Sequence, residues 1–218
     1  MQEYFDRAVI LDFFHLLNVN KINYMLIKNI DAELPEKLKV GKDVDILVHR
    51  NEIERCQSIL EENGYKKIKH PQSVETGWQL LYGAEDCMMY KSEITRLEID
   101  IHTSLCVKST MLNGWCPLDK KINEPIWNNK EWDESLDCWR LDRKTAFVYE
   151  IARCVFDKSM FSEPYIREIK LNVDLLEDSI IEDYLQVVFF KFTSELKKLI
   201  SEDAYASIVD KYYRFINY

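Results

Sequence analysis

Glycine and proline are scarce in this sequence, with five residues of each among 218. A loop-rich all-β protein or a disordered chain needs more of both, so the composition argues against these two classes. The apolar fraction of 47% and the charged fraction of 31% are ordinary for a globular protein. A chain of this length buries a sizeable core, as one large domain or as two small ones.

Positive charge is also in short supply, because 29 Lys and Arg face 38 Asp and Glu and the formal net charge is -9. A protein that follows a nucleic-acid backbone needs a basic surface, so we expect no nucleic-acid partner. A small nucleotide remains compatible with this charge, since a divalent cation and a few local Lys or Arg side chains offset its phosphates.

Several familiar signatures are absent. None of the six Cys forms Cys-x-x-Cys and no Cys/His group has zinc-ligand spacing, so we interpret them as reduced, mostly buried thiols of a cytoplasmic protein. The opening MQEYFDRAV lacks the basic start of a signal peptide, and no apolar run is long enough to span a bilayer. No Walker loop, Gly-x-Gly-x-x-Gly or Ser/His/Asp arrangement is present.

The most informative stretch that is present reads GKDVDILV, where acids alternate with branched apolar residues. Because side chains alternate along a strand, Asp43 and Asp45 should share one face, with Val44, Ile46 and Val48 on the other. Taken alone, this alternation is more typical of a solvated strand face than of a site.

A second stretch, LEIDIH, repeats the alternation and places Glu98, Asp100 and His102 on one face. If the two strands are neighbours, Asp43, Asp45 and Asp100 converge, and such carboxylates are typical ligands of one or two Mg²⁺ ions. Asp100 would also be placed to act as a general base. His102 either orients Asp100 or contacts an acceptor, or is an ordinary hydrogen-bonded histidine. The remaining candidates, His49 and His70, are interpreted as surface residues.

The pattern of apolar residues predicts an α+β protein. We expect strands over 22–29, 43–50, 65–70, 78–83, 87–91 and 95–102, the last three as successive strands of an antiparallel meander. We expect helices over 3–18, 52–63, 141–158, 163–175, 181–199 and 202–216. Asn51 with Glu54 forms a capping-box variant, and Gly64 stops that helix. We expect a packed but irregular segment over 103–140 and a division of the chain into domains 1–140 and 141–218.

These motifs in this order resemble the nucleotidyltransferase superfamily, which has the polymerase-β-like fold. The shared features are an apolar strand ending in Lys28-Asn29, Gly-x-Asp-x-Asp before apolar residues, a helix, further strands and apolar-Asp-apolar-His, over roughly 22–102. Within the superfamily, the chain looks like bacterial nucleotidyltransferases associated with polysaccharide and capsule loci. The resemblance implies a mixed β-sheet with flanking helices and a helical C-terminal region. It also implies Mg²⁺ and transfer of a nucleoside monophosphate from an NTP to a small-molecule, glycan-precursor or protein acceptor.

By the same resemblance, Asp43 and Asp45 would bind the metal and Asp100 would complete the triad. Asn29 stands where the family has a glycine that lets the backbone approach the triphosphate. Asn tolerates left-handed backbone geometry but adds bulk. Two alternatives therefore stay open: a catalytically degenerate nucleotide-binding or interaction protein on the same fold, and a toxin–antitoxin-type nucleotidyltransferase that modifies a protein.

Four basic residues are candidates for nucleotide binding. Lys28 either contacts a phosphate or is an ordinary strand-end lysine. Lys42 lies beside Asp43 and points away from the acids by alternation, which favours a surface role. Arg153 and Lys158, on a predicted C-terminal helix, either reach back over the cleft to phosphates or carry ordinary surface charge.

Overall fold

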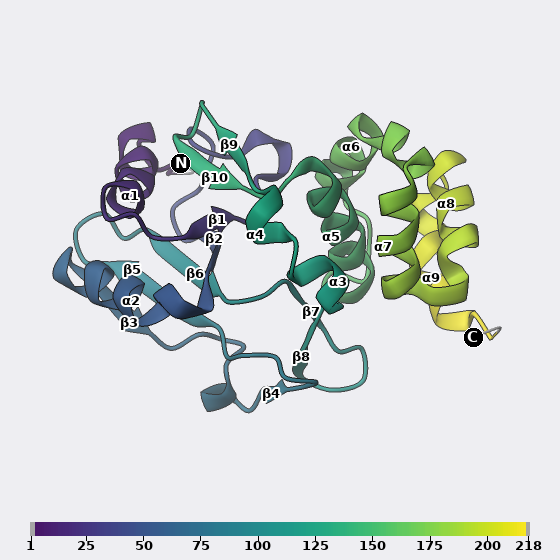
Figure 1. Cartoon of the computed structure of the whole chain (residues 1–218), viewed down its shortest axis with the longest axis horizontal. Helices are drawn as coiled ribbons and strands as arrows, with labels where there is room; N and C mark the ends of the chain where they lie inside the picture. The colour runs from purple at the N-terminus through teal and green to yellow at the C-terminus, as the bar shows by residue number, and fades with distance from the viewer. Residues whose placement is uncertain (1–2, 217–218) are drawn as a thin grey trace.

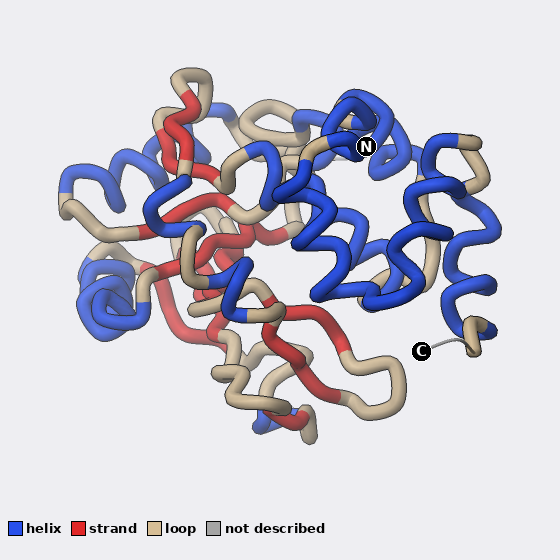
Figure 2. Tube along the Cα trace, turned by 45° about the vertical axis from the view of Figure 1, so that its right-hand side comes forward, coloured by secondary structure: helices blue, strands red, loops and turns tan. Residues whose placement is uncertain are grey.

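The computed structural model describes residues 3–216 and has mixed α+β architecture. A seven-stranded sheet with two helices beside it forms one side of the molecule, and the helices of residues 143–214 form the other (Figure 1). Figure 2 shows the same division, with the strands gathered next to the C-terminal helices. The predicted fold class, a mixed sheet with flanking helices and a helical C-terminal region, is confirmed.

The large sheet has the strand order β3-β5-β6-β2-β1-β10-β9. Its strands are β1 (Tyr24–Leu26), β2 (Asp43–Val48), β3 (Tyr65–Ile68), β5 (Met88–Ser92), β6 (Glu98–His102), β9 (Glu131–Asp133) and β10 (Cys138–Arg140). The pairs β2–β6 and β1–β10 are parallel and the other neighbours are antiparallel. The two strands that carry the predicted acids are therefore direct neighbours.

A smaller sheet has the order β4-β8-β7 and consists of β4 (Gln79–Leu80), β8 (Gly114–Pro117) and β7 (Cys106–Lys108). The expected meander is thus wrong in its first member: β5 and β6 do pair antiparallel, but β4 pairs with β8 instead. Gly114 explains the change of partner. A Cβ at this position would lie 3.1 Å from the carbonyl oxygen of Gln79, which is a tight contact, so glycine favours the close approach of the two strands.

The helices are α1 (Arg7–Val19), α2 (Ile53–Glu62), α3 (Lys120–Asn123), α4 (Ile126–Asn129), α5 (Arg143–Phe156), α6 (Glu163–Leu171), α7 (Ser179–Phe189), α8 (Thr193–Ser201) and α9 (Tyr205–Arg214). Short 3-10 turns cover Ile30–Ala32, Arg50–Glu52, Val74–Thr76, Val173–Glu177 and Phe190–Phe192. No helix among residues 3–216 is both long and apolar enough for a membrane crossing.

Two details of the predicted helices are wrong. Asn51 does not cap α2, because it lies inside the 3-10 turn that precedes this helix. The backbone N–H of Asn51 donates to the Nδ1 atom of His49. The single helix predicted over 181–199 is two helices, since Phe190 adopts φ 51° and ψ -130° between them. Neither Gly nor Pro marks this break, so the sequence carries no local signal for it. Thr193 stabilises the turn by donating its hydroxyl to the carbonyl oxygen of Leu185.

The segment 103–140 is more regular than expected. It supplies β7, β8, β9 and β10, and β10 extends the large sheet by pairing with β1. One apolar cluster runs from Met25 and Leu47 in the sheet to Phe147 and Phe189 in the helices. Because β10 is followed directly by α5, this segment connects the large sheet to the C-terminal helices. The division of the chain at residue 140 stays a prediction.

Candidate functional site

The centre of the site is the parallel pair β2–β6, whose register places Asp45 directly opposite Asp100. Both side chains are almost fully buried, with 7% and 6% of their surface exposed. The alternation predicted for β2 and β6 explains this placement, because Val44, Ile46, Ile99 and Ile101 fill the core behind the same two strands.

One oxygen of each central carboxylate has no hydrogen-bond partner in the described structure: Oδ2 of Asp45 and Oδ1 of Asp100. A buried, unsatisfied carboxylate oxygen is costly, and a divalent cation is a ligand that removes that cost. Asp45, Asp100 and His102 each offer one ligand atom within 4.8 Å of the others. These residues therefore fit a Mg²⁺-type ion, with oxygen donors from two strands.

The other oxygen of each carboxylate is held. The ammonium nitrogen of Lys28 lies 2.6 Å from Oδ1 of Asp45. The Nε2 atoms of His102 and His70 lie 3.1 Å and 3.3 Å from Oδ2 of Asp100. Each acid thus presents one engaged and one unengaged oxygen.

The electrostatics keep Asp100 ionised. Burial opposes its ionisation, but the charge of His102 and the hydrogen bonds from His102 and His70 prevail and hold the pKa of Asp100 well below its usual range. Burial likewise works against a charged His102, yet the neighbouring carboxylate raises the pKa of His102. A low pKa makes Asp100 a good metal ligand and a weak proton acceptor.

Asp43 lies at the start of β2, half-buried and opposite Glu98 in the register with β6. Burial and the repulsion from Asp45 and Asp100 raise its pKa, while Lys28 opposes the shift. Its side chain lines the cavity beside the central pair, together with Asp45.

This cavity has a volume of about 780 Å³ and is lined by four of the predicted nucleotide-binding residues, Lys28, Asn29, Lys42 and Lys158. Lys42 is exposed, and its ammonium lies 2.5 Å from Oε1 of Glu33. Lys158 is exposed at the C-terminal end of α5. The cavity therefore brings Asp43 and Asp45 together with lysines in a wall that also carries other acidic residues, such as Glu33 and Glu36.

Asn29 does not take up the left-handed geometry that its place in the motif suggested. Its backbone has φ -145° and ψ 65°, and the positive φ values nearby belong to Asp31 and Ala32. Its side-chain Oδ1 accepts a hydrogen bond of 2.7 Å from the backbone N–H of Leu34. Asn29 therefore stabilises the loop that lines the cavity.

Further cations stand close to the acids. Lys158 is largely exposed, yet partial desolvation and the charges of Arg153, Lys28 and Lys108 lower its pKa. The direction of this shift is that expected of cations lying near one another. Arg153 does not line the cavity; its Nε donates to Asp157 at 3.1 Å. Sequence reasoning missed Lys108, whose ammonium lies 5.8 Å and 5.9 Å from the ring centres of Trp78 and Trp115.

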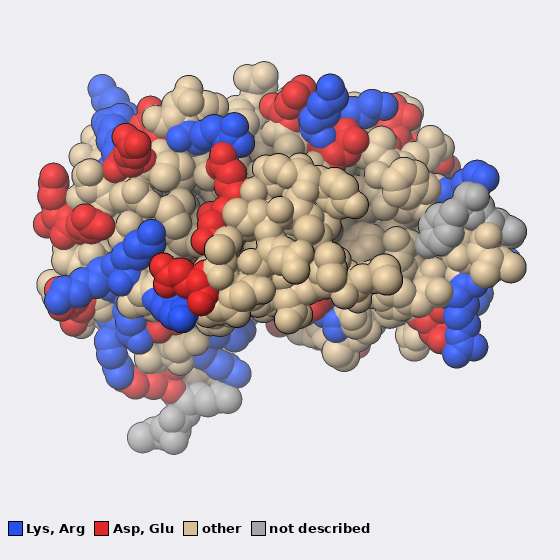
Figure 3. All heavy atoms as spheres, turned by 90° about the horizontal axis from the view of Figure 1, so that it is seen from below, with Lys and Arg blue, Asp and Glu red and all other residues tan. Residues whose placement is uncertain are grey.

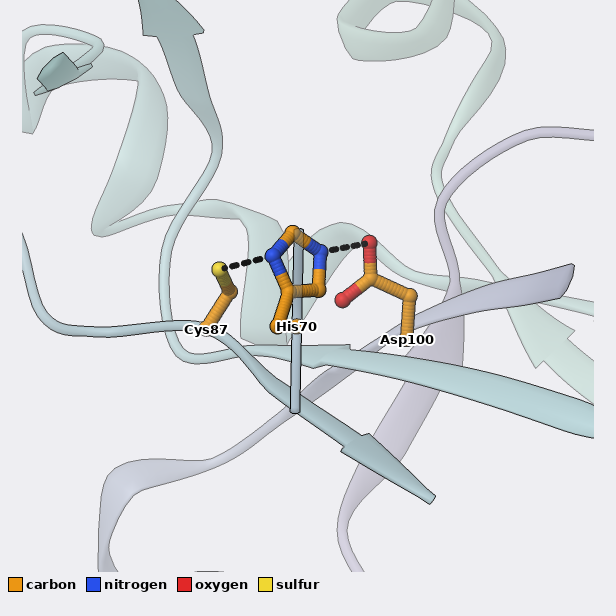
Figure 4. A group of neighbouring side chains, drawn as sticks. All are labelled: His70, Cys87 and Asp100. Carbon is orange, nitrogen blue, oxygen red and sulfur yellow. Dashed lines mark hydrogen bonds and ion pairs between the residues drawn. The ribbon is translucent and has the colours of Figure 1, made fainter. Parts of the chain in front are cut away.

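His70 is the clearest error of the sequence analysis. It was expected at the surface, but only 7% of it is exposed and it contacts Asp100. It follows the end of β3, 30 residues before Asp100, and nothing in its sequence neighbourhood marks it. Only the antiparallel path of β3, β5 and β6 brings it to the site (Figure 4).

A second cavity of about 500 Å³ shares Lys28 and Asn29 with the first and contains Glu150 of α5. Burial and the nearby Glu168 raise the pKa of Glu150 to about 8. The native state therefore holds more protons than the unfolded state between about pH 4.5 and pH 8, so stability falls as the pH rises through this window.

We accordingly expect Glu150→Gln to stabilise the protein at pH 8 by about 1–2 kcal/mol and to have little effect at pH 4.5. Urea unfolding at the two pH values measures the difference. Glu134→Gln serves as the control, because Glu134 is exposed. Its substitution should change the free energy of unfolding by the same small amount at both pH values. An equal effect of Glu150→Gln at both pH values would contradict the raised pKa.

Comparison with known proteins gives limited guidance. No protein-family model and no curated protein matches the chain. Among solved structures, the chain is similar to the solution structure of the antibiotic-resistance factor ANT(2'')-Ia, an aminoglycoside nucleotidyltransferase. The identity is 12%, the TM-score is 0.47, and the likeness covers 91% of this chain and 96% of that one. At these values it assigns neither a family nor a substrate to this chain.

Proposed function

We propose that the protein is a Mg²⁺-dependent nucleotidyltransferase that moves a nucleoside monophosphate from an NTP to a small-molecule, glycan-precursor or protein acceptor. The observation that carries the proposal is the register-matched pair Asp45 and Asp100, each with one buried carboxylate oxygen that lacks a partner. Asp45 also lines a cavity whose wall includes Lys28, Lys42 and Lys158. Paired acids beside local cations are what phosphoryl transfer needs, because positioning and charge neutralisation dominate its catalysis.

Asp45 and Asp100 would hold the metal through their unengaged oxygens, with Asp43 as the third carboxylate at the cavity side. Bound Mg²⁺ supplies neutralisation of the charge on the phosphate oxygens and alignment of the triphosphate. His70 and His102 keep Asp100 ionised and oriented. We assign Asp100 to ligation through its unengaged oxygen, and the general-base role considered for it stays a prediction.

Lys28 would exchange partners when the nucleotide binds. Its ammonium now neutralises Asp45 at 2.6 Å, and a metal on that carboxylate would leave it available to a phosphate. Lys158 lines the same cavity, and Lys108 and Arg153 add positive charge nearby. Asn29 would contribute by fixing the loop, and Lys42 lies at the cavity rim with Glu33.

In the reaction, an acceptor oxygen forms a bond to the α-phosphorus and the bond from that phosphorus to the bridging oxygen of the β-phosphate breaks. Pyrophosphate leaves, and the proton of the acceptor hydroxyl passes to water. The acidic chain, with a net charge of -9, disfavours a nucleic acid as acceptor. Figure 3 shows one face on which Lys and Arg alternate with Asp and Glu around a broad uncharged area.

The test is a transfer assay with each α-labelled NTP, Mg²⁺ and fractionated cell extract as the source of acceptors. We expect label to move from one NTP to an acceptor with release of pyrophosphate, and the transfer to stop when EDTA removes the metal. NTP binding without transfer to any fraction would favour the degenerate nucleotide-binding protein. Transfer only to a protein band would support the toxin–antitoxin alternative among the acceptor classes.

A further inference from the structure

We propose that His70 is a positioning residue that fixes the Asp100 carboxylate so that its Oδ1 atom is presented to the metal, an inference that rests on the proposed function. Metal-ligating side chains need partners that orient them, and such partners usually contact the atom that faces away from the metal. His70 meets this description from a segment outside the two acidic strands.

The contacts of His70 are all made inside the protein. Its Nε2 atom lies 3.3 Å from Oδ2 of Asp100, and its Nδ1 atom lies 3.2 Å from the sulfur of Cys87. Figure 4 shows the imidazole ring between the thiol and the carboxylate, with one nitrogen toward each. The backbone N–H of Gln72 also donates to Nδ1, at 2.9 Å.

The Gln72 contact determines the tautomer. A backbone N–H is only a donor, so Nδ1 of His70 must be the acceptor and the ring proton of the neutral imidazole sits on Nε2. That proton then points at Oδ2 of Asp100. The Cys87 thiol donates to the carbonyl oxygen of Gln72 at 3.4 Å, and burial raises its pKa to about 12, which keeps it protonated.

His70 contacts Asp100 from a segment outside β6, whereas His102 contacts it from within the same strand. His102 lies on β6 itself, two residues from Asp100, and therefore moves with that strand. His70 belongs to the turn after β3 and is anchored there, because Ser73 donates its hydroxyl to the His70 carbonyl oxygen at 3.0 Å. The two imidazoles bind the same oxygen, Oδ2, so the carboxylate plane is fixed from two sides and Oδ1 is left unpartnered.

A different use of the same residues is a metal site. One ligand atom from each of His70, Cys87 and Asp100 lies within 4.8 Å of the others. The orientation of the ring argues against it, because both nitrogens already have partners and the ring stands between the sulfur and the carboxylate (Figure 4). A site for Zn²⁺ at these three residues is therefore an outcome that the experiment must be able to detect.

Two substitutions separate the contacts of His70. Gln carries an amide nitrogen near the position of Nε2 and keeps a donor for Asp100. Asn carries its amide near Nδ1, so it keeps a partner for the Gln72 N–H and loses the donor for Asp100. The variants His70→Gln and His70→Asn are thus matched in polarity and differ in the contact that matters.

The experiment titrates Mn²⁺ into the full chain and follows free Mn²⁺ by electron paramagnetic resonance. We expect His70→Asn to weaken Mn²⁺ binding by roughly 10-fold or more, and His70→Gln to restore it to within about 3-fold of the wild type. Equal binding by both variants and the wild type overturns the positioning role. Wild-type binding with no nucleotidyl transfer overturns the proposed function instead.

A second measurement holds even if a variant fails to fold. Long-range ¹H–¹⁵N correlation spectra of the wild type report the tautomer of each histidine directly. We expect His70 as the neutral Nε2–H form, and a protonated Nδ1 would overturn the inference. With one equivalent of Zn²⁺ we expect the proton on Nε2 of His70 to remain, because a metal on Oδ1 of Asp100 leaves the contact of Nε2 with Oδ2 in place. Loss of that proton with direct metal coordination of a His70 nitrogen would replace positioning by metal ligation.

Discussion

Asp45→Asn is expected to lower nucleotidyl transfer by roughly 10³-fold or more while the protein stays folded. The exchange keeps the shape of the side chain and removes the negative charge that the metal needs on Oδ2. Asp100→Asn should have an effect of the same order, since the two residues face each other in the strand register and each has one oxygen without a partner. The double variant should be little worse than either single one, because residues that act as a unit lose their function together.

Glu98→Gln is the matched control for these variants. Glu98 lies on the same strand as Asp100, but its Oε1 atom is held by the ammonium of Lys91 at 2.7 Å. We expect at most about a 3-fold change in transfer, with the unfolding midpoint reporting any loss of stability. Transfer by Asp45→Asn at the wild-type rate would mean that the acids are a structural pair only.

Lys28→Gln is expected to change metal affinity and nucleotide affinity in opposite directions. Without nucleotide, the Lys28 ammonium occupies Oδ1 of Asp45 and opposes a second cation there. Its removal should therefore tighten Mn²⁺ binding several-fold. With nucleotide, the lost charge-assisted contact to a phosphate should weaken NTP binding by about 10- to 100-fold.

Calorimetric titrations of Mn²⁺ alone and of an NTP in saturating Mg²⁺ measure the two affinities. Lys66→Gln is the control, because Lys66 is an exposed strand lysine whose ammonium pairs with Glu93, and neither affinity should change by more than about 2-fold. If Lys28→Gln weakened both ligands equally, Lys28 would be a support for the fold at Asp45 and not a phosphate contact.

The acidic pair was predictable because its information is local. Alternation in each strand placed Asp45 and Asp100 on the faces opposite Val44 and Ile99, and the resemblance implied that the two strands meet. Lys28 was a candidate for the same reason, since it lies two residues beyond β1, the strand that pairs with β2. The sequence did not show which carboxylate oxygens of Asp45 and Asp100 have hydrogen-bond or ion-pair partners, because some of these partners come from other segments of the chain.

His70 and Lys108 show why those partners were missed. His70 reaches Asp100 through two antiparallel pairings, and Lys108 reaches the basic region from β7 of the smaller sheet. No spacing or periodicity encodes either approach. Arg153 shows what reasoning from charge alone leaves out, because its guanidinium pairs with Asp157 one helical turn away. Its role in nucleotide binding stays a prediction.

The break of the helix at Phe190 also depends on contacts between residues that are distant in the sequence. The apolar periodicity of 181–199 continues through it, and the turn is stabilised by tertiary contacts of Phe189 and Phe192 with Tyr212 of α9. The local pattern of apolar and acidic residues therefore predicted most helices and strands and the strand face that carries Asp45 and Asp100. Long-range packing decided where the helices end and which side chains surround these two acids.

The most direct test of the metal site is a crystal structure of the protein with Mn²⁺ and a non-hydrolysable NTP analogue, using the anomalous signal of manganese. We expect a peak within about 2.0–2.4 Å of both Oδ2 of Asp45 and Oδ1 of Asp100, with the triphosphate in the adjoining cavity. A bound nucleotide with no manganese between these two oxygens, or with manganese only at other residues, would contradict it.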